Sequence, residues 1–186
     1  VFFLAINSVY ASECLVEEEF FQYKCSGTVK VKNITELNSY LSNYGIRKNV
    51  IKSLEIDFPL NGTQILNIHS PCQIKFSTNS NIDLPNNLCI YSKEDVRFFE
   101  NFNIKVAGNL KIVSEERIIF QDNLRISAET VELKSIGTSV ESRVRISNDS
   151  ALNVKNLIIS SNERSVIGER VNISASESVR MYTKQD

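Results

Sequence analysis

The chain has 186 residues, of which 21 are Lys or Arg and 22 are Asp or Glu, so its net charge at pH 7 is −1. This length suits one domain, and the near-neutral charge excludes a global electrostatic preference for nucleic acid or for an anionic membrane. Plentiful Asn, Ser and Thr, with no Trp and only 3 Pro, favour turn-rich β structure.

The first eleven residues, VFFLAINSVYA, form an apolar run that ends in small residues at Val9 and Ala11. This pattern is typical of the second half of a secretory signal peptide, with cleavage after Ala11. A first core strand or a short membrane anchor is the alternative, but about 10 apolar residues cannot span a bilayer that requires about 20. No other stretch is long and apolar enough to be transmembrane. Residues 1–11 therefore predict an exported protein, which is secreted, periplasmic or located at the cell surface.

The four cysteines are Cys14, Cys25, Cys72 and Cys89, and all lie in the first half of the chain. An even number suits two disulfides in an exported protein, and three pairings are open. We expect the local pairs, Cys14 with Cys25 and Cys72 with Cys89, because they close the shortest loops. There is no C-x-x-C spacing and only one histidine, His69, so the sequence indicates no metal site. His69 lies three residues from Cys72, where a structural cystine is favoured over a thiol nucleophile.

Residues 12–60 contain one convincing helix, in the segment NITELNSYLSNYG. Asn33 is the expected N-cap, Glu36 occupies the capping-box position and Gly45 ends the helix. A helix with a single apolar face needs a core to cover, and the alternating strand KSLEIDF follows it directly. We therefore expect residues 12–60 to form an N-terminal cap on whatever follows. The apolar residues at helical spacing are Ile34, Leu37, Leu41 and Tyr44.

From Leu66 onward the chain consists of apolar-x-apolar dyads separated by polar corners. The dyads align in four columns when the chain is cut about every 27 residues, with spacings from 26 to 30. Such a repeat predicts that dyads point inward while successive coils stack in parallel, about 4.8 Å apart. Residues 61–186 are thus predicted to form a β-solenoid of about four coils, with a β-sandwich as the alternative. The first column is Leu66/Ile68, Val96/Phe98, Leu124/Ile126, Leu152/Val154 and Val179/Met181.

The dyad columns and the preceding amphipathic helix resemble the right-handed parallel β-helix of pectate-lyase-like enzymes and filamentous-haemagglutinin-type adhesins. The resemblance covers residues 66–181 and is one of repeat pattern. The enzyme branch of that architecture is known for aspartates and basic residues clustered on one face, whereas this chain has only six Asp in all. We therefore expect a non-enzymatic binding, adhesive or structural module. A polysaccharide lyase or glycoside hydrolase is the alternative.

Asp95, Asp122 and Asp149 recur at the predicted repeat of about 27 residues, each before a dyad of the first column, so we expect them to stack at one corner. Their carboxylates are expected to form the turns through side-chain to backbone hydrogen bonds. Under the enzymatic alternative they could instead bind calcium or supply an acid and a base. No other cofactor is expected.

The middle residues of the first-column dyads are expected to face outward as one stripe. Its guanidinium and amide groups could bind a uronate, sulfate or phosphate group on a glycan or cell-surface component, or could pair structurally with the aspartates. The sequence has no phosphate-binding loop, and its basic residues are not interleaved with aromatic ones as on a nucleic-acid surface. The stripe residues are Asn67, Arg97, Arg125, Asn153 and Arg180.

An open solenoid end exposes unpaired strand edges, which invite pairing with another chain. After Met181 the sequence continues only as YTKQD. Three interpretations remain open: these polar residues blunt the edge, the chains associate end to end, or the sequence belongs to a longer protein.

Overall fold

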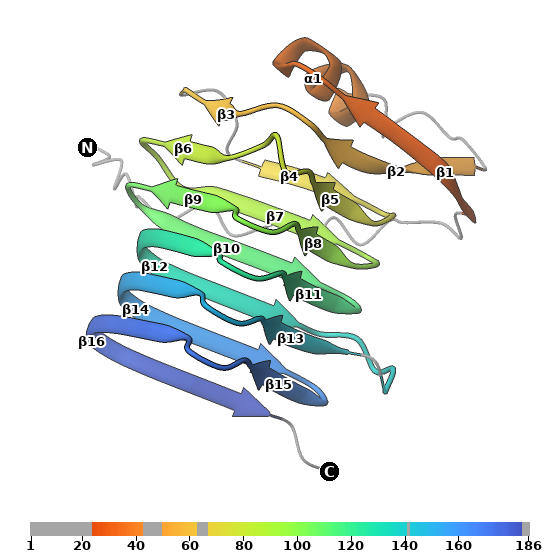
Figure 1. Ribbon diagram of the computed structural model, residues 1–186. Coiled ribbons are helices and arrows are strands. Elements are labelled where there is room, and N and C mark those ends of the chain that lie inside the picture. Colours follow the sequence, from red (N-terminus) through yellow and green to blue (C-terminus); the bar gives the residue numbers. More distant parts are fainter. Residues whose placement is uncertain (1–23, 43–49, 63–66, 141, 184–186) are drawn as a thin grey trace, which may run out of the picture.

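The computed structural model describes residues 24–42, 50–62, 67–140 and 142–183 (Figure 1). The predicted signal peptide, Cys14 and Gly45 lie outside these residues. Within them the chain forms one helix, α1 (Ile34–Ser42), and sixteen strands, all paired in parallel. The predicted parallel β-helix is therefore confirmed, and the β-sandwich, which needs antiparallel neighbours, is excluded.

Each turn of the chain passes three faces, one formed by sheet A and two by the arms of a second sheet, which we name arm B1 and arm B2. Strands β12, β14 and β16 run through the corner between the two arms, so each contributes its first half to B1 and its second half to B2. Sheet A consists of β1 (Lys24–Val31), β2 (Val50–Ile56), β5 (Ile74–Phe76), β8 (Val96–Phe98), β11 (Arg117–Phe120), β13 (Arg143–Ile146) and β15 (Arg164–Ile167). Arm B1 begins with β3 (Leu60–Asn61), β6 (Ile82–Leu84) and β9 (Asn103–Val106), and arm B2 with β4 (Asn67–Ser70), β7 (Leu88–Ser92) and β10 (Asn109–Ser114). Both arms are then completed by β12 (Arg125–Ser135), β14 (Ala151–Ser161) and β16 (Asn172–Thr183).

The coil is shorter than predicted, at about 22 residues instead of about 27. In arm B1, Leu60, Ile82, Ile104 and Ile126 are register partners on successive strands, at equal steps along the sequence. The next step, from Ile126 to its partner Leu152, is longer because the corner after β12 is extended. The stack consequently has about seven turns rather than the four predicted.

The longer predicted period failed for a geometric reason. A step of about 27 residues overshoots a coil of about 22 residues by roughly a quarter of a turn, so each predicted column drifts from one face to the next. The predicted first column passes from Ile68 on arm B2 to Phe98 on sheet A, then to Ile126 on arm B1 and back to Met181 on arm B2. The dyads themselves were recognised correctly, since their apolar residues point into the core in most coils.

The core of sheet A is aromatic. Phe76, Phe98 and Phe120 stack on successive coils, with ring centroids 4.6 and 4.7 Å apart, and Phe102 packs edge-on against the first two. All four rings are fully buried. Because the rings repeat in register, one coil supplies the stacking partner of the next, which a single coil could not provide.

Buried serines connect the coils at the corner where arm B2 leads into sheet A. Ser92 Oγ donates to the carbonyl of Cys72 on the preceding coil (2.9 Å) and accepts the N–H of Glu94 (3.1 Å). Ser114 repeats this pattern one coil further on. Each hydroxyl thus satisfies two corner groups that would otherwise be buried without a partner, which costs about 1–3 kcal/mol per group. The serine ladder consists of Ser70, Ser92, Ser114, Ser135 and Ser161.

Helix α1 covers the N-terminal end of the stack, as predicted (Figure 1). Asn33 Oδ1 accepts the N–H of Glu36 (2.9 Å), and Glu36 in turn accepts the N–H of Lys32 (2.7 Å). Leu37 is fully buried in the core, and the Tyr40 hydroxyl donates to the carbonyl of Lys52 (2.7 Å). Strands β1 and β2, which lie in the segment expected to form the cap, are hydrogen-bonded members of sheet A.

Cys25 is bonded to Cys72, so the predicted local disulfide pairs are wrong. The chain returns to the same corner once per coil, and two such returns bring Cys72, in the corner after β4, beside Cys25 of β1, although the two cysteines are 47 positions apart in the sequence. Sequence separation is therefore a poor guide to proximity in a solenoid. Cys89 is also disulfide-bonded.

The described residues contain no helix with the length and apolar character needed to cross a membrane.

Candidate functional site

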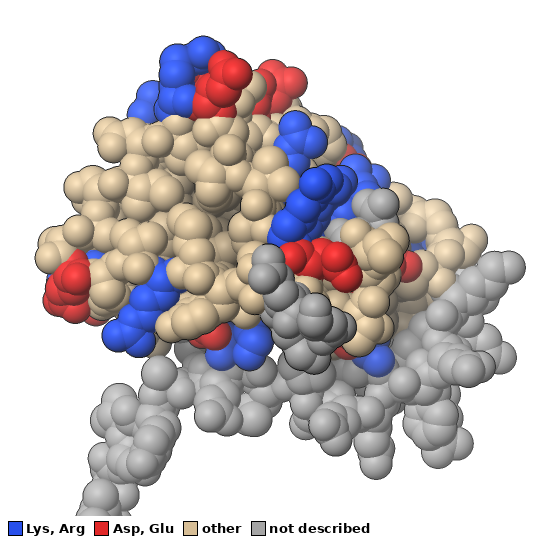
Figure 2. All heavy atoms as spheres, turned by 90° about the horizontal axis from the view of Figure 1, so that it is seen from below, with Lys and Arg blue, Asp and Glu red and all other residues tan. Residues whose placement is uncertain are grey.

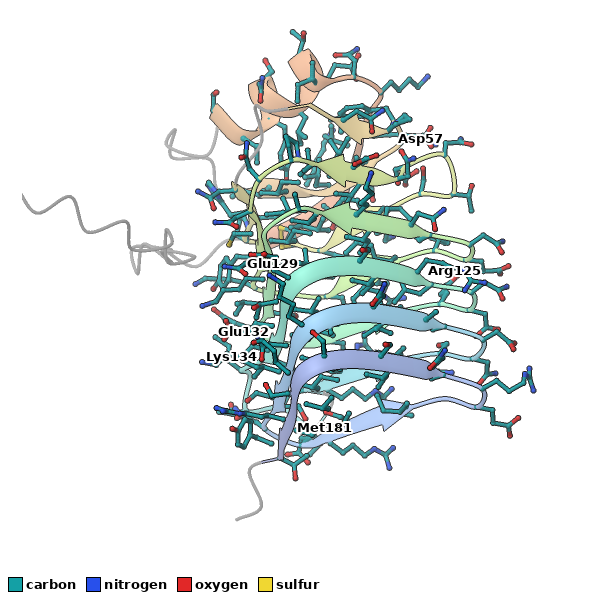
Figure 3. The ribbon with its side chains drawn as sticks, turned by 90° about the vertical axis from the view of Figure 1, so that its left-hand side faces the viewer. Asp57, Arg125, Glu129, Glu132, Lys134 and Met181 are labelled. Carbon is teal, nitrogen blue, oxygen red and sulfur yellow. A yellow bond between two sulfur atoms is a disulfide. The ribbon has the colours of Figure 1, made fainter. Side chains whose placement is uncertain are left out.

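The residues predicted to form one outward stripe lie on three different faces. Arg97 is on sheet A, Arg125 and Asn153 are on arm B1, and Asn67 and Arg180 are on arm B2. Figure 3 labels one of them, Arg125, which projects from a middle coil. Arg180 belongs to the last strand, β16. The prediction of a single stripe is wrong because it depended on the longer period.

The three aspartates do not form one stack either. Asp95 precedes β8, at the corner that leads from arm B2 into sheet A, whereas Asp122 and Asp149 lie at the opposite corner, between sheet A and arm B1. There, Asp122 Oδ1 accepts the N–H of Asn148 on the next coil (3.0 Å), which is a contact between coils rather than the local turn-forming bond that was predicted. Asp149 has a positive φ of 57° and pairs with Arg170 Nε (2.6 Å). These positions do not assemble an acid and base pair.

The register of the shorter coil instead gathers basic side chains on the outer face of sheet A. The five strands β5, β8, β11, β13 and β15 together contain six Lys or Arg and no acidic residue. They form two adjacent columns that run along the solenoid axis with a rise of about 4.8 Å per coil. We name this set the basic ladder: Lys75, Arg97 and Arg145 in one column, with Ile119 between the last two, and Arg117, Arg143 and Arg164 in the other.

Asp95 anchors the upper half of the basic ladder. Its carboxylate is 2% exposed and accepts two bonds from Arg117, at 2.8 Å each, and two from Arg97, at 2.7 and 3.0 Å. Gln73 Nε2 donates to the same carboxylate (3.2 Å). Burial alone raises the pKa of Asp95, but the hydrogen bonds from Arg117 and Arg97 outweigh it and hold the pKa below its usual value. One carboxylate thus fixes two guanidinium groups while balancing one of their charges.

Two arginines in the lower half of the basic ladder are exposed to solvent. Arg143 and Arg164 are direct register partners on adjacent strands, and Arg145 lies two residues along from Arg143 on the same side of the sheet. Arg145 and Arg164 are exposed, and neither forms an ion pair with any acidic side chain among the described residues. The guanidinium groups of Arg145 and Arg164 are therefore available to an external anion. Neighbouring positions of the basic ladder are about 5–7 Å apart on the sheet.

The extended corner after β12 flanks the ladder. At this corner Arg143 follows Ser135 by eight positions, whereas at the equivalent corner of the preceding coil Arg117 follows Ser114 by three. The added residues form a loop at the ladder's own corner, held by Asn162 Nδ2, which donates to the carbonyls of residues 136 and 137 (2.7 and 2.9 Å).

Sequence reasoning identified Arg97 but missed the other arginines of the ladder. The signal that could have found them is the serine ladder, whose members recur once per coil at a single corner. Aligning the chain on those serines gives the correct coil length. It then places Arg117, Arg143 and Arg164 at one corner.

One group of potential metal ligands comes together in the described part of the chain: the Sγ atoms of Cys25 and Cys72 and a carboxylate oxygen of Glu94. Because both sulfurs are committed to the disulfide, neither is a thiolate, and the group is not a metal site. The same disulfide removes Cys72 as a nucleophile beside His69.

Comparison with known proteins gives no further guide, since no family model, no curated protein sequence and no solved structure matches the chain.

Proposed function

We propose that this chain is an exported, non-enzymatic β-solenoid that binds an acidic polysaccharide along the outer face of sheet A. The observation that carries the proposal is the basic ladder, in which five stacked strands present six basic and no acidic residues. A polymer with repeated carboxylate or sulfate groups fits such a ladder, because each coil offers a cation at a regular rise along the axis.

The ladder is costly to the fold, which supports a role outside folding. Arg117, Arg143 and Arg164 are stacked directly opposite one another on adjacent strands. Like charges in such cross-strand positions destabilise a sheet by a few tenths of a kcal/mol to about 1 kcal/mol per pair. Arg117 is held by Asp95, whereas Arg164 forms no ion pair with an acidic side chain among the described residues. An anionic ligand that bridges the arginines would remove this repulsion.

Two features favour a polysaccharide over a nucleic acid. The outward residues between the cations on sheet A are Ile119 and Val166, so these strands offer no aromatic side chain on which a base could stack. The Cys25–Cys72 disulfide is typical of an oxidising, extracytoplasmic compartment, where acidic glycans are the common polyanions.

Binding of a defined panel tests the proposal. Isothermal titration calorimetry of the purified chain with heparin and with polygalacturonate should show saturable binding that weakens as salt is raised, because the contacts are between exposed charges. Neutral dextran of the same length should not bind. Absence of binding to both acidic glycans, or tighter binding to single-stranded DNA than to either, would contradict the proposal.

A further inference from the structure

The two halves of the basic ladder hold their guanidinium groups in different ways. In the upper half, Arg97 and Arg117 are both bonded to the buried carboxylate of Asp95. In the lower half, Arg145 and Arg164 form no ion pair with an acidic side chain among the described residues. A bonded guanidinium is held in one orientation, whereas an exposed and unpaired arginine keeps its rotamer freedom. The ladder therefore combines fixed cations with movable ones.

Asp95 holds Arg97 by one edge of its guanidinium group. Asp95 Oδ2 accepts hydrogen bonds from Nε (3.0 Å) and Nη2 (2.7 Å) of Arg97, which lies two positions further on and on the same side of the strand. The carboxylate is itself held from other directions by Nε and Nη2 of Arg117 and by Nε2 of Gln73. Because the carboxylate cannot turn, the plane of the Arg97 guanidinium is fixed as well.

The other edge of the Arg97 guanidinium is available to a ligand. A guanidinium has five N–H donors in one plane, so a contact through Nε and Nη2 leaves the edge formed by Nη1 and Nη2. The Arg97 side chain is 36% exposed, and its Nη1 has no bonding partner among the described residues. Figure 2 looks along the solenoid and shows charged side chains around the margin of a broad uncharged surface. A polymer that lies along the solenoid therefore meets the charged side chains from the side.

We propose that Arg97 is the specificity-determining residue of the basic ladder, and that it selects a uronate polymer over a sulfated one. This inference rests on the proposed function and adds the class of anionic group. A carboxylate is planar, and its two oxygens match one edge of a guanidinium group. A sulfate is tetrahedral and spreads its charge over three oxygens, so it gains less from one fixed planar edge.

Asp95 is a positioning residue in this arrangement. It orders the Arg97 side chain before the ligand arrives, so binding does not have to supply the entropy cost of ordering it. Arg145 and Arg164 lack such a partner among the described residues, and their side chains must be ordered on binding. Their exposed charges attract any polyanion, with a strength that falls as salt is raised. The upper half of the ladder thus selects the ligand, and the lower half attracts it.

A substitution that conserves charge tests the inference. Arg97→Lys keeps the positive charge but removes the planar edge. Isothermal titration calorimetry with polygalacturonate and with heparin, at one salt concentration, measures the affinity of each protein for both glycans. Arg97→Lys should lose about fivefold in affinity for polygalacturonate and less than about twofold for heparin. Arg145→Lys is the matched control and should change neither affinity by more than about twofold, because its role is Coulombic.

A second variant tests the role of Asp95. Asp95→Asn keeps the charge and the planar edge of Arg97 but weakens the bonds that fix it, so the ratio of polygalacturonate affinity to heparin affinity should fall as in Arg97→Lys. Circular dichroism checks that each variant is folded, and Arg97→Lys suffices if Asp95→Asn is not. The inference is overturned if Arg97→Lys lowers both affinities equally or lowers neither, or if Arg145→Lys has the same effect. A wild type that binds heparin but not polygalacturonate also overturns it, whereas a wild type that binds neither glycan contradicts the proposed function itself.

Discussion

Sheet A and arm B1 are built from the same coils, and in both the inward side chains are apolar and buried. Their outer faces differ. On the coils from β5 to β15, the strands of sheet A carry six basic and no acidic residues. The arm B1 segments of the same coils carry both signs equally, with Lys105, Arg125 and Lys155 against Asp83, Glu129 and Glu177.

The difference shows that the coil does not need an excess of positive charge on its surface. Arm B1 folds with a nearly neutral outer face, so the repeat is specified by its inward residues, the serine ladder and the turns. Arg97 and Arg117 belong to the fold through Asp95, whereas Arg145 and Arg164 are exposed, form no ion pair with an acidic side chain among the described residues and are additional to the requirements of the fold. Residues that weaken a fold without structural need are the ones most reasonably assigned to binding.

The largest effect should come from Asp95. Replacing Asp95 by Ala removes the buried carboxylate that holds Arg97 and Arg117. Breaking such a pair leaves guanidinium groups close together without compensation, so we expect a loss of about 3 kcal/mol in the free energy of unfolding. Urea denaturation followed by circular dichroism measures it.

Asp83→Ala on arm B1 is the matched control. Asp83 also pairs with a cation, Lys105, but at 3.5 Å and with both side chains more than half exposed. The expected loss is below about 0.5 kcal/mol. Equal losses in the two variants would mean that the buried cluster of sheet A has no special role in the fold.

Asp57, which directly follows β2 of sheet A, should make the free energy of unfolding sensitive to acid. Hydrogen bonds from Lys30 and Ser77 lower the pKa of Asp57 from 3.8 to about 2. Because the folded pKa is the lower one, the contribution is complete above the unfolded value and is lost as the pH falls from 4 to 2. The wild type should therefore lose stability over this window more steeply than Asp57→Asn. Identical slopes for the two proteins would show that the Lys30 contact contributes nothing.

The smallest predicted effect is an increase, rather than a loss, in the free energy of unfolding. Arg164→Gln removes one member of the stacked pair with Arg143. Loss of this repulsion should raise the free energy of unfolding by about 0.5 kcal/mol. Arg125→Gln on arm B1, whose register partners are Asn103 and Ala151, should leave stability unchanged. Destabilisation by Arg164→Gln would contradict the view that the ladder opposes the fold.

Much of the fold was predictable from the sequence because the inward dyads are a local pattern. Ile104 and Val106, for example, alternate with polar neighbours and are buried as expected. The cap was predictable for the same reason, since Asn33 and Glu36 are close neighbours in the sequence. The coil length was not recovered, because apolar dyads occur on all three faces and align almost as well at the longer period as at the true one. The buried serines that end the strands of arm B2 are register partners on successive coils, so Ser92 and Ser114 define the period where the dyads do not.

The candidate site depended entirely on that period. Arg97 was correctly seen to face outward because this follows from its own dyad. Its neighbours were assigned wrongly because a period that is too long moves each successive side chain to another face. The Cys25–Cys72 disulfide was missed for a related reason, since it joins residues two coils apart along the chain that no local spacing connects.

The most direct test of the account compares two charge-matched double variants. Arg145→Ala/Arg164→Ala removes two exposed cations from sheet A, and Lys105→Ala/Arg125→Ala removes two from arm B1, so both proteins have the same net charge. Heparin affinity is measured for both by isothermal titration calorimetry at one salt concentration. We predict a loss of at least about tenfold for the sheet A variant, or about 1.4 kcal/mol, with little change for the arm B1 variant. Equal losses in the two variants, or a larger loss for arm B1, would contradict the assignment of the binding face to sheet A.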